Sequence, residues 1–302
     1  MIPNFPKFKK LEVYDKKSIE SFTKQYPPYS DFNFVSLWNY DTEEKCKISL
    51  LHNNLVIKFT DYITNEPIYG FLGDNQVCET IKILLKLAKD SKDKPILKLV
   101  PEQNLKKEKK IIKQKFEVKE DRDNYDYIIS VRQLILLPGK KFKSKRRLIN
   151  KIKNNMTIKT RELDLKREKI KKEIKDLFYL WEKIKNKKRR ETETELIALE
   201  RLMQKEAFFK LISLGFYKKN KLAGFTINEI LPDRYYMGHF GKADSTPGLY
   251  KYMEYKTAKI MSKFGCRYMN YQQDLGLPGL RKSKQGWSPI RYLKKFIITE
   301  KI

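Results

Sequence analysis

The sequence predicts a mixed α/β (α+β) fold with two similar halves, each with a mixed central sheet flanked by helices. Three observations lead to this prediction. Apolar residues make up 40% of the 302 residues, enough for one large or two ordinary globular domains. Helical periodicities and strand-like alternation follow one another in a similar order in both halves. A run of positive charge that begins near residue 139 separates a first domain, 1–138, from a second, 139–302.

In the first half, a loop with Pro27, Pro28 and Ser30 precedes a segment in which Phe34, Leu37 and Trp38 have helical spacing. The remaining elements are recognised by alternation, by short apolar runs or by helical periodicity. We predict strands over 47–53, 54–60, 68–73, 95–100 and 121–130, and a helix over 79–89.

The second half repeats this order. Its predicted helices are 170–185, 193–208 and 249–265, and its predicted strands are 210–219, 222–231, 233–244 and 266–274. Gly265 ends the last helix, and Lys219 to Lys221 join the first two strands. Two helices, an antiparallel meander, a helix and a further strand is the order of a Gcn5-related acyltransferase fold. An ordinary mixed α+β sandwich has a similar order.

The charge indicates a polyanionic partner. The chain has 66 Lys+Arg against 37 Asp+Glu, a formal net charge of +29. Residues 140–190 hold 22 of these cations against 6 acids, which weakens the alternative that a biased genome explains the charge. Residues 139–156 predict a basic amphipathic helix suited to phosphates. Its candidate anion- or tRNA-binding residues are Lys141, Lys143, Lys145, Arg146 and Arg147; the alternative is a solvated helix face or a linker.

Other classes of site are disfavoured. The three cysteines are far apart, and the two histidines are His52 and His239, so we expect neither a metal site nor a disulfide framework. No segment has the roughly 18 consecutive apolar residues that span a bilayer, and the N-terminus lacks an apolar signal region. We expect a cytoplasmic protein that can still dock peripherally on the inner membrane surface, with its oligomeric state open.

Residues 270–289, NYQQDLGLPGLRKSKQGWSP, concentrate an acid, amides, glycines, cations and a tryptophan after a predicted strand. Such a mixture is more typical of a site than of a core. Structural alternatives stand beside each candidate: Asp274 can cap the short helix that follows, and Arg281 and Lys284 can form a surface pair. We interpret Trp287 beside Pro289 as scaffold.

Three stretches together resemble a known family: YSDFNFVSLWNYD, YDYIISVRQLILLPGKKFKSKRRLINKIKNN, and HFGKADSTPGLYKYM with the segment above. The chain is similar from about residue 20 to 298 to the family of the C-terminal catalytic domain of phosphatidylglycerol lysyltransferase, especially its stand-alone bacterial branch. The resemblance implies tandem Gcn5-related folds joined by a basic helix, with the reaction site in the second. It also implies transfer of an amino acid from aminoacyl-tRNA to a lipid head group or a related acceptor.

The spacing also bears on the donor. Acyl-CoA-dependent enzymes of this fold use a glycine-rich loop before the central helix, whose N–H groups hold the pyrophosphate. Here the position reads GKADSTPGLYKY, where Gly248 alone remains and Pro247 has no N–H. We therefore expect no bound cofactor and no metal, with aminoacyl-tRNA favoured over acyl-CoA as the donor.

Aminoacyl transfer needs positioning, a proton acceptor and a stabilised oxyanion. The candidate catalytic residues are Asp274 as base or as anchor, Lys242 and Arg281 as cations, and Asp244. The candidate substrate-binding residues are Tyr250, His239, Asn270, Gln272, Gln273 and Lys284. His239 lies among aromatics, and a core or pocket role fits it better than catalysis. Two other functions stay open: a CoA-dependent N-acyltransferase, and a non-catalytic module that binds RNA or a membrane surface.

Overall fold

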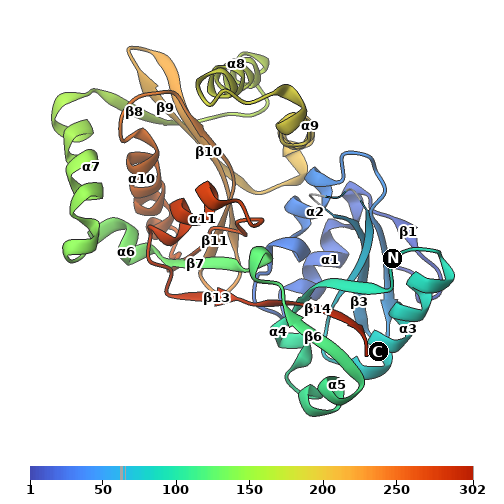
Figure 1. Cartoon of the computed structure of the whole chain (residues 1–302). Helices are drawn as coiled ribbons and strands as arrows, with labels where there is room; N and C mark the ends of the chain where they lie inside the picture. The colour runs from blue at the N-terminus through green and yellow to red at the C-terminus, as the bar shows by residue number, and fades with distance from the viewer. Residues whose placement is uncertain (62–63, 65, 302) are drawn as a thin grey trace. The chain divides into compact units, whose positions relative to one another are not determined.

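The computed structural model describes residues 1–61, 64 and 66–301, which form two compact units. The first unit comprises Met1–Tyr127, Gln272–Gly286 and Arg291–Ile302, and the second comprises Ile128–Tyr271 and Trp287–Ile290. Each unit is built around one mixed sheet flanked by helices (Figure 1). The predicted fold class is thereby confirmed.

The first unit has the strand order β1-β2-β3-β4-β5-β14-β6. Its strands are β1 (Lys9–Lys10), β2 (Lys47–Leu51), β3 (Asn54–Thr60), β4 (Pro67–Leu72), β5 (Ile96–Pro101), β6 (Phe116–Glu120) and β14 (Lys295–Glu300). Its α-helices are α1 (Lys16–Thr23), α2 (Phe34–Tyr40), α3 (Val77–Asp90), α4 (Glu102–Leu105), α5 (Lys109–Lys115) and α11 (Pro278–Gln285). Two short 3-10 helices, η2 (Ser30–Phe32) and η3 (Arg122–Asn124), also belong to this unit.

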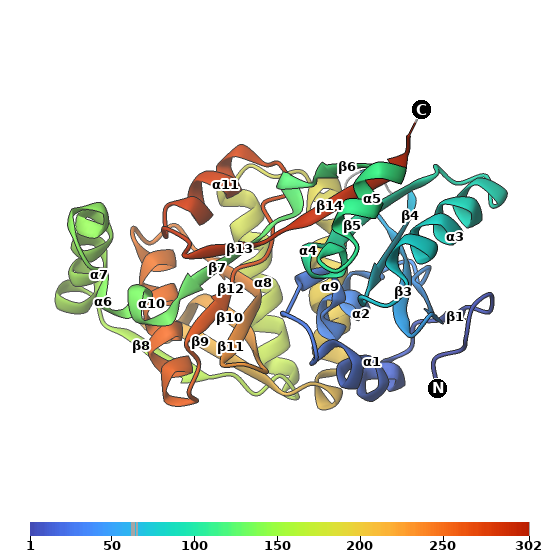
Figure 2. The ribbon, with the colours of Figure 1, turned by 90° about the horizontal axis from the view of Figure 1, so that it is seen from below.

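Strand alternation sorts the core of this sheet into two faces. Tyr69 and Phe71 of β4 pack with Ile81 and Leu84 of α3 in one hydrophobic cluster. On the other face, Gly70 leaves room for Phe59 and Phe32, whose rings meet edge to face at 5.7 Å. The view from below shows α3 and α1 on opposite sides of these strands (Figure 2).

The C-terminal strand β14 lies between β5 and β6, antiparallel to both. The division therefore differs from the predicted second domain, 139–302, because the last strand completes the first sheet. Ile298 of β14 is fully buried in that core, and Lys295 is fully buried between two carboxylates.

The second sheet has the strand order β13-β7-β12-β11-β10-β9-β8, and its β13 and the first two residues of β7 belong to the first unit. The strands are β7 (Asp126–Ser130), β8 (Ile158–Glu162), β9 (Leu211–Lys218), β10 (Lys221–Leu231), β11 (Tyr235–Ala243), β12 (Tyr268–Asn270) and β13 (Arg291–Leu293). The α-helices are α6 (Val131–Leu136), α7 (Lys143–Asn155), α8 (Glu168–Ile184), α9 (Glu193–Gln204) and α10 (Leu249–Lys263).

Local sequence explains the meander at the centre of this sheet. Lys219 and Asn220 both have positive φ, 49° and 62°, which suits a two-residue hairpin between β9 and β10. β11 returns antiparallel to β10, and β12 then pairs with β11 in parallel, from Tyr235–Tyr268 to Met237–Asn270. Two helices, a three-strand meander, helix α10 and strand β12 follow in the predicted order.

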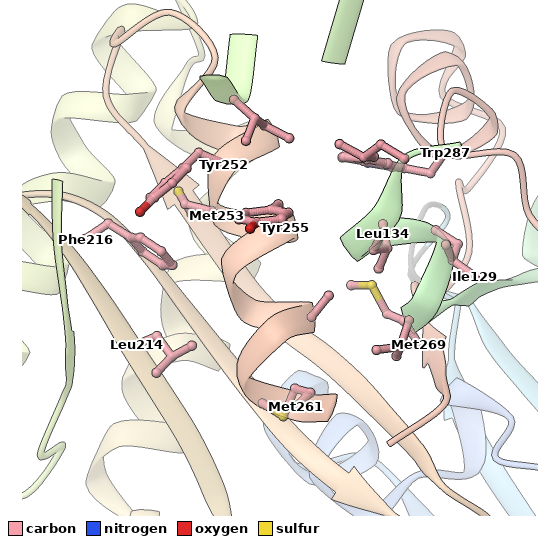
Figure 3. Packing of buried hydrophobic residues seen from close by; sticks show 14 of the residues in the cluster. Ile129, Leu134, Leu214, Phe216, Tyr252, Met253, Tyr255, Met261, Met269 and Trp287 are labelled. Carbon is pink, nitrogen blue, oxygen red and sulfur yellow. The ribbon is translucent and has the colours of Figure 1, made fainter. Parts of the chain in front are cut away.

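Helices cover both faces of this sheet, α8 on one and α10 on the other (Figures 1 and 2). Residues of α10 pack with the sheet in one hydrophobic cluster, in which Tyr252 and Met253 lie near Phe216, and Trp287 lies near Leu134 (Figure 3). Trp287 is 0% exposed, as its interpretation as scaffold requires. None of the helices among the described residues is long and apolar enough to cross a bilayer.

Candidate functional site

A tight turn after β12 positions Asp274. Gln272, Leu275 and Gly276 have φ values of 55°, 53° and 72°, and the Asp274 carboxylate accepts the N–H of Gly276 at 2.9 Å. Pro278 then starts α11, which brings Arg281 one turn later to the same carboxylate. Leu277, not Asp274, is the N-cap residue of α11, and no side chain makes a cap hydrogen bond there.

Arg281 and Asp274 form a two-pronged ion pair. Arg281 Nε donates to Oδ2 at 3.0 Å and its Nη2 donates to Oδ1 at 2.8 Å. Nη2 also donates to Asp123 at 2.5 Å. Two parallel hydrogen bonds of this kind fix the orientation of the guanidinium relative to the carboxylate and favour the ionised form of both groups.

Two residues near the start of β7 complete the surroundings of Asp274. Tyr127 donates its hydroxyl proton to Asp274 Oδ2, and Arg122 Nη1 lies 3.4 Å from the same oxygen. The Asp274 side chain is 0% exposed. Burial by itself raises a carboxyl pKa, but the hydrogen bonds from Arg281, Tyr127 and Gly276 outweigh it and lower the pKa of Asp274. A carboxylate so occupied suits an anchor better than a proton acceptor.

Arg122 is held from several sides at once. Its guanidinium lies 5.0–5.4 Å from the rings of Tyr125, Tyr127 and Tyr292. Its Nη2 donates to the hydroxyl of Tyr127 at 3.0 Å. The side chain is 34% exposed, so this pre-ordered cation still reaches solvent.

A second network adjoins the first along the chain, and the side chains of Lys295, Asp31 and Asp126 in it are fully buried. Lys295 pairs with Asp126 at 2.9 Å and with Asp31, and Ser30 Oγ donates to Asp126 at 2.5 Å. Gln273 belongs to this network, because it donates to Asp31 at 3.2 Å and its Oε1 lies 2.6 Å from Ser30 Oγ. Gln273 therefore holds the turn at Asp274 in place.

In the second unit, Lys242 of β11 occupies an aromatic cage. Its Nζ lies 3.7 Å from the ring centroid of Trp181 and 5.3 Å from that of Phe178, both in α8. It donates to Glu195 of α9 at 2.7 Å. Burial lowers the pKa of Lys242, and the neighbouring Glu195 offsets part of this effect.

The loop before α10 uses its own polar groups. Asp244 accepts the N–H of Thr246 at 2.8 Å, and the N–H of Leu249 bonds to the carbonyl of Thr246 at 3.1 Å. The Tyr250 hydroxyl accepts the N–H of Ala243 at 3.1 Å. With Pro247 in the same loop, few N–H groups remain to bind a pyrophosphate.

Three of the other predicted substrate-binding residues are buried. His239 pairs with Glu229 at 3.1 Å inside the sheet, which agrees with a core role. Asn270 is fully buried at the end of β12, and Lys284 is buried in α11. The Gln272 carbonyl accepts the backbone N–H of Tyr127 at 3.3 Å.

The predicted basic helix is a short 3-10 turn, η4 (Lys140–Phe142), followed by α7. Lys141, Lys143 and Arg147 are exposed, whereas Lys145 is half-buried over Trp287. Arg146 differs, because its guanidinium turns back to the carbonyls of Leu137 and Gly139 and closes the preceding turn.

The structure thus brings Asp274 together with Arg281, and places Tyr250 on the backbone beside Lys242. Sequence reasoning missed Arg122, Tyr127, Glu195 and Trp181. The charged and aromatic DRDNYDY run was a signal for the first two, but its pairing with Asp274 spans about half of the chain. Within the described part of the chain, no three His, Cys, Asp or Glu residues are placed to hold a metal ion.

Residues 55–299 match the family described as phosphatidylglycerol lysyltransferase, C-terminal. The chain belongs to this family. The resemblance found in the sequence is thereby confirmed, and it covers both units.

Solved structures agree. A conserved protein of unknown function from Bacteroides thetaiotaomicron covers 100% of both chains at 26% identity, with a TM-score of 0.86. The C-terminal domain of a putative lysylphosphatidylglycerol synthetase from Agrobacterium fabrum covers 96% of this chain and 93% of its own at 9% identity, with a TM-score of 0.66. L-PGS from Bacillus licheniformis covers 97% and 94% at 11% identity, with a TM-score of 0.64. The last two show a shared fold. No curated protein sequence matches this chain.

Proposed function

We propose that this protein transfers an aminoacyl group from aminoacyl-tRNA to an amine or hydroxyl of a lipid head group or a peptide. The observation that carries the proposal is the family match over residues 55–299, which supports transferase activity. The donor and the acceptor are part of the proposal.

The loop before α10 supports an RNA-borne donor over acyl-CoA. The N–H groups of Thr246 and Leu249 donate hydrogen bonds within the loop, and Pro247 has no N–H group. The Asp244 carboxylate adds negative charge. A coenzyme pyrophosphate needs the opposite arrangement. The exposed cations Lys141, Lys143 and Arg147 suit an RNA backbone instead.

The proposed step is direct acyl transfer. The acceptor amine or hydroxyl attacks the ester carbonyl carbon, the new N–C or O–C bond forms, and the C–O bond to the ribose breaks. The acceptor loses one proton, and the departing ribose oxygen takes one up. Because the ester is already activated, the protein has to position both substrates and stabilise the oxyanion.

Lys242 is the proposed oxyanion-stabilising group. Its ammonium is buried and uses one of its three donors on Glu195, and Trp181 holds it from one side. A pre-ordered cation in a dry site stabilises developing negative charge better than a solvated one. We assign Asp274 the role of anchor, since it orients Arg281, Arg122 and Tyr127.

Arg122 is the proposed contact for an anionic part of the acceptor or donor. Three tyrosine rings and Asp274 fix its guanidinium, and its side chain remains 34% exposed. A guanidinium has five N–H donors, and fixing it in advance reduces the entropy lost on binding.

The test supplies purified protein with tRNA charged with labelled amino acids and with total lipid and peptide extracts. We expect label to move to an acceptor, and Lys242→Met to reduce the rate at least about 100-fold. A parallel calorimetric titration with acetyl- and long-chain acyl-CoA addresses the other donor. Transfer from acyl-CoA with none from any charged tRNA would overturn the proposal. Salt-dependent RNA or vesicle binding without any transfer would indicate a binding module instead.

A further inference from the structure

Helices α7 and α10 lie side by side in the second unit and pack through residues spaced four apart (Figure 1). On α7 these are Lys145, Ile149 and Lys153, and on α10 they are Lys251, Tyr255 and Lys259. Ile149 and Tyr255 are buried in the shared core, so the lysines lie at its edges. We call these four lysines, with Trp287 and Tyr255, the cation seam.

One end of the seam is a pair of ammonium groups on one indole. Lys145 Nζ lies 5.2 Å and Lys251 Nζ lies 5.1 Å from the ring centroid of Trp287. Burial lowers the pKa of both lysines, and the charge of Lys251 further lowers that of Lys145. Both side chains are half-buried, and the Trp287 ring is held by Phe142 at 6.5 Å.

The other end gathers two lysines around a phenol. Lys153 Nζ lies 4.1 Å from the ring centroid of Tyr255, and Lys259 follows Tyr255 by one turn. Although burial raises the pKa of Tyr255, hydrogen bonds and positive charge from Lys153 and Lys259 bring it below its usual value. The two ends are eight residues apart along α10, about 12 Å.

The four lysines of the cation seam, of which Lys145 and Lys251 are half-buried, differ from two buried lysines among the described residues. Lys242 and Lys295 each pair with carboxylates. Among the described residues, no carboxylate forms an ion pair with Lys145, Lys153, Lys251 or Lys259. The negative charge of Glu254 offsets part of the effect of burial on the pKa of Lys251, but the Glu254 carboxylate accepts a hydrogen bond from Tyr271 at 2.6 Å. Holding like charges together without an anion costs free energy that a bound anion would recover.

We propose that the cation seam binds two phosphates of an RNA strand, one between Lys145 and Lys251 and the other between Lys153 and Lys259. This rests on the proposed function, because the RNA is the donor tRNA, and it adds α10 to the contact surface, with the buried Trp287 ring beneath the lysines. Two anion sites about 12 Å apart match a ligand with repeated phosphates. A lipid head group supplies one phosphate, so it would engage one end.

The test compares Lys251→Gln with Lys256→Gln in the full-length protein. Both variants lose one positive charge from the same helix. Lys256 lies about 140° around the helix axis from Lys251, so it is outside the seam. The probe is an uncharged tRNA transcript, measured by fluorescence anisotropy from 50 to 200 mM salt. We expect Lys251→Gln to weaken binding about 3- to 10-fold and to lower the salt slope by about one. Lys256→Gln should match the wild type, and thermal unfolding checks that both variants fold.

Other results separate this inference from the proposed function. If the two variants bind tRNA equally while the wild type still transfers amino acid, the seam is refuted and the proposed function stands. If Lys251→Gln loses binding to phosphatidylglycerol vesicles but keeps tRNA binding, the ligand is a lipid and the RNA inference fails. A wild type that neither binds tRNA nor transfers amino acid refutes both.

Discussion

Arg281 donates two hydrogen bonds to Asp274, from Nε to one carboxylate oxygen at 3.0 Å and from Nη2 to the other at 2.8 Å. Arg281 is only seven residues from Asp274 in the chain, yet Tyr127 and Arg122, which are 147 and 152 residues earlier, contact the same carboxylate. Asp274 therefore ties the segment after β12 to the start of β7. This makes it a fold determinant of the first unit as well as a site residue.

Replacing Asp274 with Ala should destabilise the protein by about 3–5 kcal/mol. The change leaves two guanidinium groups and the Tyr127 hydroxyl without their acceptor. Urea unfolding at pH 7 measures the effect. Asp90→Ala, at the exposed end of α3, is the control and should change stability by less than about 0.5 kcal/mol. A loss as small as that of the control would show that Asp274 is not an anchor.

Asp274 also predicts a pH dependence. Its pKa is lowered in the folded state, so the stability that it contributes is present above its usual pKa of 3.8 and is lost as pH falls through the lower folded value. The wild type should lose stability on acidification below about pH 4, and Asp274→Asn should lose less over the same range. Parallel slopes for the two proteins would contradict this.

Asp31 should behave in the opposite way. Burial, only partly offset by Lys295, raises its pKa to about 6. A raised carboxyl pKa means that the folded state holds the proton more tightly than the unfolded state does. The stability that protonated Asp31 contributes is therefore lost as pH rises from about 4 to 6. Asp31→Asn should gain about 1–3 kcal/mol relative to the wild type between pH 4 and pH 7. Urea titrations at both pH values measure it, and a difference that is constant with pH would refute it.

Lys242→Met should separate stability from activity. Methionine keeps the apolar stem against Trp181 and Phe178 and removes a buried charge, so unfolding should change by less than about 1.5 kcal/mol. Transfer activity should fall at least about 100-fold. Glu195→Gln is the matched variant, which keeps a hydrogen-bond acceptor and should lose less activity. Full activity in Lys242→Met would remove Lys242 from the reaction.

Gly248 should tolerate no side chain. Its φ is 84°, and an added Cβ would lie 3.0 Å from Cβ of Leu148 on α7. Gly248→Ala should therefore destabilise the protein by about 1–3 kcal/mol. Gly279 in α11 is the control, because a Cβ there meets nothing within 4 Å, so Gly279→Ala should be neutral or slightly stabilising. Equal unfolding midpoints for the two variants would contradict the strain.

Part of the site could be predicted because its signals are local. Asp274 and Arg281 lie in one short segment, and Lys242 and Tyr250 flank one strand-to-helix loop. Arg122 and Tyr127 were missed since nothing near them in the chain indicates a partner beyond residue 270. Glu195 and Trp181 were missed for a related reason: α8 and α9 have ordinary amphipathic patterns, and only their packing on β11 points these side chains at Lys242.

The sequence by itself determined the fold class, the order of elements in the second unit, the basic helix and the family. The first three depend on periodicity, turn residues and composition, which act over a few residues at a time, whereas the family depends on the resemblance of three stretches of the chain. Only the tertiary structure decided that β14 completes the first sheet, that Asp274 is saturated by donors, and that Lys145 and Lys251 share one indole. Those relationships join segments far apart in the chain, and burial and charge there depend on which side chains the fold brings together.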